Sequence, residues 1–149
     1  MSGHTPWARI HHKREEKVRP VTKTDEEWRT SLPPLTYEVL RHKATEHPGT
    51  SEYEHSTVEG TFLCAGCGAP LFDSESKFDS GCGWPSFFTP ASGAPVEERQ
   101  DYSLILPRTE VVCGNCGGHL GHVFHDGPPP THLRYCINGA AIKLAPSAV

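Results

Sequence analysis

Two Cys-x-x-Cys motifs constrain the fold of this chain more than any other feature. Cys64 and Cys67 form the first motif, and Cys113 and Cys116 form the second. Each follows a short apolar run and precedes a glycine, which is typical of a zinc knuckle, where a tight turn lets two thiolates reach one tetrahedral ion. Four thiolates complete the coordination sphere, so the sequence predicts a structural zinc site without an open catalytic position. A thioredoxin-like redox motif is the competing interpretation, but it requires a βαβ context that is not apparent here.

The composition favours short strands joined by many turns. The chain has 14 glycines and 14 prolines among 149 residues, and apolar runs of strand length enter and leave both motifs. Further strand candidates are residues 102–106, 120–124, 133–138 and 141–144. We therefore expect a single mainly β domain over residues 24–149, with its β core at about 57–146.

Two short helices are expected before the β core, within residues 25–47. Residues 1–23 carry many basic side chains and little apolar periodicity, which predicts a disordered tail. Thr24 and Glu27 have the spacing of a capping box, and Pro33 suits the start of a second helix that ends near His47. The side chains that this helix would present to the core are Leu35, Val39 and Leu40.

Charge and hydropathy exclude several classes of partner. Lysine and arginine total 14 against 18 aspartates and glutamates, for a net charge of −4, so a nucleic-acid partner is not expected. We find no apolar run of membrane-span length and no apolar segment typical of a secretory signal. The expectation is a cytoplasmic monomer, in which cysteines serve more often as metal ligands or redox groups than in structural disulfides.

The thiol of Cys136 lies in a run of strand-forming residues. Strand alternation places Arg134, Cys136 and Asn138 on one face, with Tyr135 and Ile137 on the other. A guanidinium beside a thiol favours the thiolate, so we expect Arg134 to raise the thiolate fraction of Cys136. Taken alone, the run fits a buried structural cysteine equally well.

Cys82 is the other thiol outside the two motifs. Glycines flank it on both sides, which indicates an accessible loop, and Trp84 follows two residues later. An indole beside a thiol can form an apolar floor for a methyl group, although tryptophan is also a common core residue. Two uncommitted cytosolic thiols are candidates for a catalytic cysteine and its resolving partner.

His119 and His122 follow the second motif directly. Histidines can donate protons near neutral pH, and the competing interpretations are zinc ligation or a structural role. On a regular strand the two rings would point to opposite faces, so a bend at Gly121 is needed to bring both into one pocket.

Five motifs in order give the chain a specific resemblance over roughly residues 24–146. They are Cys64-x-x-Cys67, Gly81-Cys82-Gly83-Trp84-Pro85-Ser86-Phe87, Cys113-x-x-Cys116, His119-x-Gly121-His122-Val123-Phe124 and Arg134-Tyr135-Cys136-Ile137-Asn138. Together they resemble the zinc-containing B-type peptide methionine-(R)-S-oxide reductases. One departure is His125, where the family commonly has proline before Asp126.

The resemblance implies two antiparallel β-sheets with short N-terminal helices, and zinc on the side away from the active site. It implies that Cys136 is the nucleophile and Cys82 the resolving thiol. The substrate methyl group would contact Trp84 and Phe124, and the residues that would arrange water and protons are His119, His122, Arg134 and Asn138. A thioredoxin would recycle the enzyme, and no organic cofactor is needed.

Two other classes of function remain open from the residues. A zinc-ribbon module that binds protein or nucleic acid explains the four motif cysteines but leaves Cys82, Trp84 and Cys136 without a role. A zinc hydrolase or deaminase requires an open metal position and a nearby carboxylate base.

Overall fold

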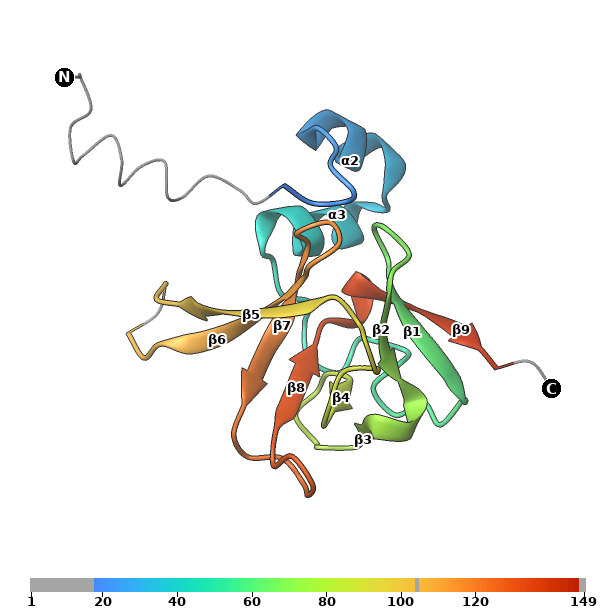
Figure 1. The fold of residues 1–149 in the computed structure, drawn as a ribbon, viewed down its shortest axis with the longest axis vertical. Coiled ribbons are helices and arrows are strands. Elements are labelled where there is room, and N and C mark those ends of the chain that lie inside the picture. Colours follow the sequence, from blue (N-terminus) through green and yellow to red (C-terminus); the bar gives the residue numbers. More distant parts are fainter. Residues whose placement is uncertain (1–17, 104, 148–149) are drawn as a thin grey trace.

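A computed structural model describes residues 18–103 and 105–147 (Figure 1). The helices and 3₁₀ turns are α2 (Asp25–Ser31), α3 (Pro34–His42), η1 (Ser74–Ser76) and η2 (Gly139–Ala141). The strands are β1 (Gly60–Cys64), β2 (Pro70–Asp73), β3 (Lys77–Phe78), β4 (Ser86–Phe87), β5 (Val96–Asp101), β6 (Arg108–Cys113), β7 (His119–Phe124), β8 (Arg134–Ile137) and β9 (Ile142–Pro146).

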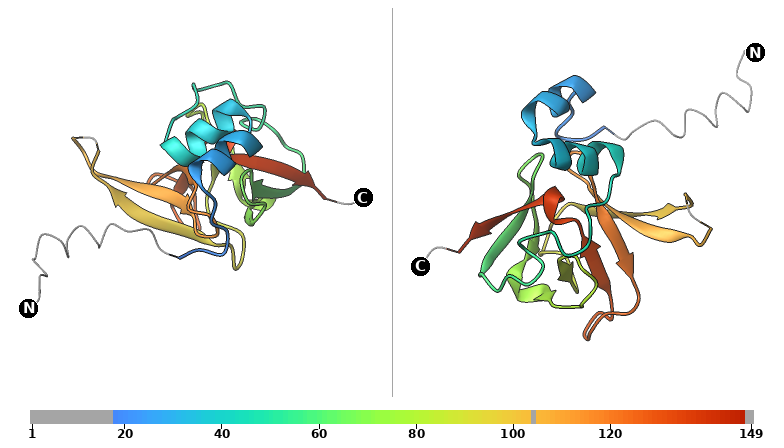
Figure 2. Two further views of the ribbon diagram at one scale, coloured as in Figure 1. Left: turned by 90° about the horizontal axis from the view of Figure 1, so that it is seen from above. Right: turned by 180° about the vertical axis from the view of Figure 1, so that it is seen from behind.

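The strands form two antiparallel sheets, as predicted. One has three strands in the order β2-β1-β9, and the other has six in the order β3-β4-β8-β7-β6-β5. All seven strand pairs are antiparallel. The two helices pack at one end of the sheets, over the loops that follow β1 and β6 (Figures 1 and 2). Among the described residues, neither helix is long and apolar enough to cross a membrane.

Aromatic side chains from both sheets fill the space between them. The Phe87 ring lies 5.2 Å from Phe62 and 4.5 Å from Phe72, and the Phe72 ring lies 5.7 Å from Tyr135. Tyr135 and Ile137 are both buried in this core. Since they alternate with Arg134, Cys136 and Asn138, the core holds β8 with the polar face of the strand turned away from it.

The capping box of α2 is confirmed, but α3 is shorter than predicted. Thr24 Oγ1 accepts a hydrogen bond from the Glu27 backbone N–H, and the Glu27 carboxylate accepts one from the Thr24 N–H. The second helix ends at His42, because Lys43 adopts a left-handed conformation with φ of 60°. The chain that follows leaves the helix axis, and the Glu46 N–H donates to the Asn138 side chain at 3.0 Å. The prediction that Leu35 packs in the core is wrong, since it is 50% exposed, whereas Val39 and Leu40 are buried.

The strand predicted at residues 102–106 is also misplaced. The strand is β5, which pairs along its whole length with β6 as the edge of the larger sheet. Its sequence, Val-Glu-Glu-Arg-Gln-Asp, is polar because most of it faces solvent, so apolar periodicity does not reveal it. The apolar residues after Asp101 lie instead in the connection to β6, of which Leu104 is outside the described residues.

The predicted tail covers residues 1–23, but its last residues contact the folded domain. Residues 1–17 lie outside the described residues, whereas residues 18–23 run along the loop of the second Cys-x-x-Cys motif. The Arg19 guanidinium donates to the Gly114 carbonyl at 3.0 Å, and the Val21 N–H donates to the Asn115 carbonyl at 3.0 Å.

Candidate active site and metal centre

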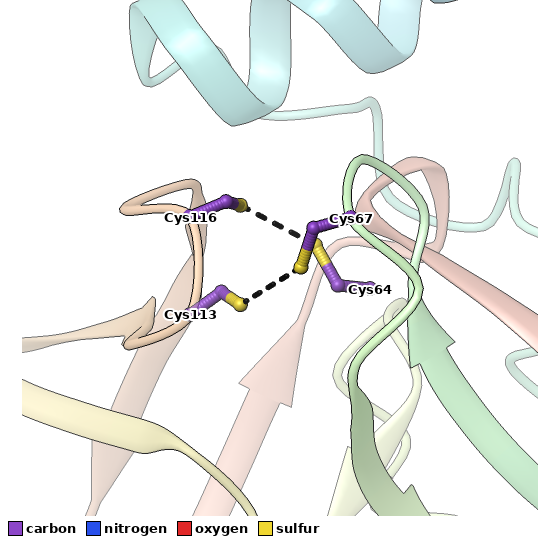
Figure 3. Close-up of side chains that lie close together, drawn as sticks. All are labelled: Cys64, Cys67, Cys113 and Cys116. Atoms are coloured by element: carbon purple, nitrogen blue, oxygen red, sulfur yellow. Dashed lines mark hydrogen bonds between the residues drawn. The ribbon is translucent and has the colours of Figure 1, made fainter. Parts of the chain in front are cut away.

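The four motif cysteines converge between the loops that follow β1 and β6 (Figure 3). Cys64 Sγ lies 3.7 Å from Cys116 Sγ, and Cys67 Sγ lies 3.7 Å from Cys113 Sγ. All four sulfurs are within 4.8 Å of one another. Such a compact set of soft donors can hold one metal ion, as the duplicated spacing predicts.

Both knuckles are built by the same backbone turn. The glycine after each second cysteine donates its N–H to the carbonyl of the first cysteine, from Gly68 to Cys64 at 2.9 Å and from Gly117 to Cys113 at 2.7 Å. The Asn115 side-chain amide donates to Cys67 Sγ at 3.2 Å, which favours the thiolate that a metal requires. The Arg41 guanidinium ties α3 to the Cys116 carbonyl at 2.9 Å.

Strand register places Cys136 in the larger sheet between two polar neighbours. It stands opposite His122 of β7 on one side and Ser86 of β4 on the other. Next to His122, a Cβ on Gly121 would collide with the Cys136 carbonyl oxygen. Glycine is therefore required there for β7 to approach β8 at Cys136.

The loop before β4 brings Cys82 to Cys136. Their Sγ atoms are 3.4 Å apart, and Cys82 Sγ lies 3.4 Å from Ser86 Oγ. Gly83 has φ of +101°, and a Cβ on it would lie 2.6 Å from Pro48 Cβ, so only glycine suits this turn. Because a disulfide bond measures about 2.05 Å, a small side-chain shift suffices to join the two thiols.

A cavity of about 240 Å³ contains both thiols in its wall. Its lining residues are Thr45, Cys82, Trp84, Arg108, Gly121, His122, Phe124, Arg134, Cys136 and Asn138. The structure thus brings together seven of the eight residues proposed for catalysis and substrate binding; the one left out is His119. None of the four motif cysteines lines this cavity, so the candidate metal centre and the candidate active site are separate.

A bulge in β7 aligns the two histidines. Val111 pairs with Gly121, but Val112 pairs with His119, so one extra residue of β7 is accommodated at this point. The rings of His119 and His122 therefore lie together, 5.5 Å apart in an edge-to-face arrangement. The bend expected at Gly121 occurs directly before it. His119 is 2% exposed and lies behind His122, where its Nδ1 is 2.7 Å from a Glu110 carboxylate oxygen.

A buried carboxylate orients His122. The His122 Nε2 is 3.0 Å from Asp101 Oδ2. Hydrogen bonds from Ser103 and His122 hold the pKa of Asp101 well below its usual range, so the carboxylate accepts and His122 Nε2 carries the hydrogen. Burial lowers the pKa of His122, and Asp101 offsets this only in part, which keeps the ring neutral near pH 7.

The two thiols differ in acidity. Burial raises the pKa of Cys82, but hydrogen bonds with Ser80 and Ser86 outweigh burial and bring that pKa below its ordinary value. Burial and the neighbouring Cys82 together raise the pKa of Cys136 to about 12. In the substrate-free protein Cys136 therefore holds its proton.

Arg134 has less effect on Cys136 than the sequence suggested. Its Nε and Nη2 donate to both carboxylate oxygens of Asp126, at 2.9 and 3.1 Å, and its guanidinium lies 4.5 Å from the centre of the Phe124 ring. The guanidinium lowers the pKa of Cys136 but does not overcome burial. Arg134 thus favours the Cys136 thiolate, in the expected direction, but burial and the neighbouring Cys82 outweigh it.

Asn138 and Trp84 are both fixed by the main chain of Glu46. Asn138 Oδ1 accepts from the Glu46 N–H at 3.0 Å, and Asn138 Nδ2 donates to the Leu120 carbonyl at 3.0 Å. The Trp84 indole N–H donates to the Glu46 carbonyl at 3.1 Å. One short segment thus sets the positions of two cavity walls.

The family model for the SelR domain matches residues 32–146, a range that includes every candidate ligand and cavity residue named above. This chain belongs to the SelR domain family. The resemblance drawn from the five motifs is confirmed.

The SelR domain has close relatives among curated proteins named Peptide methionine sulfoxide reductase MsrB. The protein of this name from Bradyrhizobium diazoefficiens is 60% identical over 126 residues, which are 85% of this chain and 91% of the relative. The protein from Pseudomonas savastanoi pv. phaseolicola is 55% identical over 124 residues, which are 83% of this chain and 95% of the relative. The protein from Agrobacterium fabrum is 53% identical over 126 residues, which are 85% of this chain and 93% of the relative.

Sequence reasoning missed several residues of this SelR site. Arg108 and Thr45 line the cavity, and Asp101 and Glu110 support the two histidines. The available signal for Arg108 and Glu110 is the polar Arg-Thr-Glu run that begins the otherwise apolar strand β6. The register of β5, β6 and β7 was needed to connect that run with the histidines.

Proposed function

We propose that this protein reduces methionine-(R)-sulfoxide in proteins to methionine by thiol chemistry, with the free amino acid as a further candidate substrate. The observation that carries this proposal is the pair of thiols 3.4 Å apart in the wall of a cavity that Trp84 and Phe124 also line. Family membership supports the reaction class, because the relatives are named peptide methionine sulfoxide reductases. The choice of the R epimer rests on the motif resemblance alone.

In the first step Cys136 Sγ attacks the sulfoxide sulfur. Because the Cys136 thiol is protonated before substrate binds, its proton must reach the sulfoxide oxygen as the bond between Cys136 Sγ and the sulfoxide sulfur forms. His122 is the candidate relay, since it lines the cavity as a neutral ring held by Asp101, and His119 positions it from behind. In net terms the substrate S–O bond breaks, methionine sulfur regains an electron pair, and Cys136 becomes a sulfenic acid.

In the second step Cys82 attacks the Cys136 sulfenic acid. A Cys82–Cys136 disulfide forms, and the sulfenic hydroxyl leaves as water with the proton of the second thiol. The lowered pKa of Cys82 suits it to this nucleophilic role. An external dithiol, for which we propose thioredoxin, then reduces the disulfide by thiol–disulfide exchange.

The four-cysteine cluster is proposed to hold a structural zinc ion. A tetrahedral ion with Zn–S bonds of about 2.3 Å separates its sulfurs by about 3.8 Å, and the two closest sulfur pairs measure 3.7 Å. Zinc there would join the two loops that follow β1 and β6 and supply no step of the reaction.

The proposal is tested with separated R and S epimers of N-acetyl-methionine sulfoxide methylamide and dithiothreitol as reductant. We expect turnover of the R epimer by wild type and none by Cys136→Ser. Cys82→Ser should complete one turnover and accumulate sulfenic acid but fail to recycle with thioredoxin. Normal turnover by Cys136→Ser would refute the nucleophile, and unchanged thioredoxin-driven turnover by Cys82→Ser would refute the resolving thiol.

A further inference from the structure

An apolar groove adjoins the active-site cavity and has no role in the reaction proposed above. Its volume is about 700 Å³. The walls come from Ile105, Leu106 and Pro107 in the β5–β6 connection, and from Val123, Phe124 and His125 at the end of β7. His125, the departure from the family motif, thus faces a groove whose other walls are mainly apolar.

The groove exposes aliphatic side chains to water, which is unfavourable in free energy. Ile105 and Leu106 are 99% and 76% exposed, although both would gain free energy by leaving water. They lie near the tip of the β5–β6 hairpin, which projects from the body of the molecule (Figures 1 and 2). Neighbouring exposed aliphatic side chains at the mouth of a cavity indicate a binding surface.

The groove adjoins the catalytic cavity and is separated from it by the Phe124 side chain. Phe124 and Arg108 line both. The hairpin tip is also tied to the catalytic histidine, since one oxygen of Asp101 accepts the Ser103 N–H at 3.0 Å and the other accepts from His122. A molecule that enters the cavity at Phe124 therefore has the groove beside it.

Arg108 is a second feature of this junction. Its side chain lines both the cavity and the groove and is 36% exposed. A guanidinium in the wall of a binding site can donate hydrogen bonds to a peptide carbonyl. The guanidinium charge is already opposed by Asp101 at 3.9 Å, so the junction does not call for an acidic side chain.

We propose that the cavity and the groove together bind an extended segment of oxidised protein. This inference rests on the proposed function: methionine sulfoxide occupies the cavity, and an aliphatic side chain two residues away occupies the groove. In an extended chain, residues two apart point to the same side and lie about 6.6 Å apart, which suits two neighbouring sites separated by one side chain, Phe124. The main-chain carbonyl between them would accept a hydrogen bond from the Arg108 guanidinium.

The groove fits the substrate better than the reductant. A reductant must reach the disulfide at Cys82, and none of the groove's lining residues belongs to the 79–87 segment that carries this thiol. The substrate segment, in contrast, must pass Phe124 to place its sulfoxide beside Cys136.

The test compares blocked pentapeptides with a central methionine-(R)-sulfoxide and dithiothreitol as reductant. Leucine is placed two residues before or two residues after the sulfoxide in a glycine background, and serine replaces it in the reference peptide. For wild type we expect kcat/KM to be about tenfold higher for one of the leucine peptides, the gain from partly burying that side chain. The Ile105→Ser/Leu106→Ser double variant should lose this advantage.

The controls separate this inference from the proposed function. N-acetyl-methionine sulfoxide methylamide has no flanking side chain, so wild type and the double variant should reduce it equally. Val58→Ser, which changes an exposed aliphatic residue that does not line the groove, should keep the leucine advantage. If wild type reduces the blocked amino acid but discriminates less than twofold between leucine and serine peptides, the groove assignment fails and the proposed function stands.

Other outcomes also overturn the assignment. A leucine preference that survives in the double variant places the subsite elsewhere. A double variant that loses only thioredoxin-driven turnover assigns the groove to the reductant, and a dimer that dissociates in the variant assigns it to a second copy of the chain. Failure of wild type to reduce the blocked amino acid would overturn both proposals.

Discussion

The buried Glu46 side chain offers the most direct test of which hydrogen bonds position the cavity walls. It is 4% exposed, and its two carboxylate oxygens accept the backbone N–H groups of Gly139 at 2.7 Å and Ala140 at 2.9 Å. Its main chain holds Asn138 and Trp84, as described above. The carboxylate therefore fixes the segment after β8 to the segment after α3.

Glu46→Gln keeps the shape of this side chain and removes one acceptor. The glutamine oxygen can serve one of the two N–H groups, but its NH₂ group then faces the other, and two donors cannot bond. A hydrogen bond to a charged group contributes about 1.5–3 kcal/mol, and a buried donor without a partner costs about 1–3 kcal/mol. We expect a loss of about 2–4 kcal/mol in unfolding free energy, or roughly 5–12 °C in Tm for a chain of this length.

The measurement is urea and thermal unfolding at pH 7, followed by tryptophan fluorescence and circular dichroism. Glu52→Gln is the matched control, because Glu52 is an exposed glutamate in the same connection. Its substitution should change stability by no more than about 0.5 kcal/mol. A loss below about 1 kcal/mol for Glu46→Gln, or one equal to that of the control, would show that the two backbone bonds do not hold the segment.

Three further outcomes are expected. Burial raises the pKa of Glu110, but hydrogen bonds from His119 and Arg99 outweigh burial and lower that pKa from 4.5 to about 2. As pH falls, the Glu110 carboxylate therefore binds its proton in the unfolded chain before it does so in the folded protein. Up to about 3 kcal/mol of unfolding free energy should be lost between pH 4.5 and 2. Urea unfolding at several pH values should show a flatter acid dependence for Glu110→Gln, and an equally steep loss would contradict the assignment. Iodoacetamide at pH 7 should modify Cys82 before Cys136, because the pKa of Cys82 is lowered and that of Cys136 is raised to about 12. Peptide mapping that finds Cys136 modified first would refute this order of acidity. Cys64→Ser should abolish binding of one zinc ion per chain and lower Tm, whereas a metal-free variant with unchanged Tm would show that the cluster does not stabilise the fold.

Local sequence determined a large part of this protein. The duplicated Cys-x-x-Cys spacing predicts the four-cysteine cluster, because two residues between thiols and a following glycine are enough to build each knuckle turn. The alternation around Cys136 predicts which side chains share each face of β8, since strand periodicity is a property of the backbone. The capping box likewise depends on only four consecutive residues.

Errors arose where the pattern depended on distant contacts. The edge strand β5 is polar, so apolar periodicity favours a strand at residues 102–106 instead, where Tyr102, Ile105 and Leu106 are exposed. The sequence predicts that α3 continues to about His47, because nothing in the helix itself shows that the following residues must turn toward Asn138 and Gly139.

Only the tertiary structure decided the chemistry of the site. Cys82 and Cys136, 54 positions apart in the sequence, are brought to thiol contact by the register of β4 on β8. One bulge in β7 brings the rings of His119 and His122 together. The protonated state of Cys136 follows from burial and from the neighbouring Cys82, although the adjacent Arg134 suggests the opposite from sequence. Strand register, burial and charge pairing depend on contacts between residues far apart in the chain, so they cannot be predicted from a local sequence pattern.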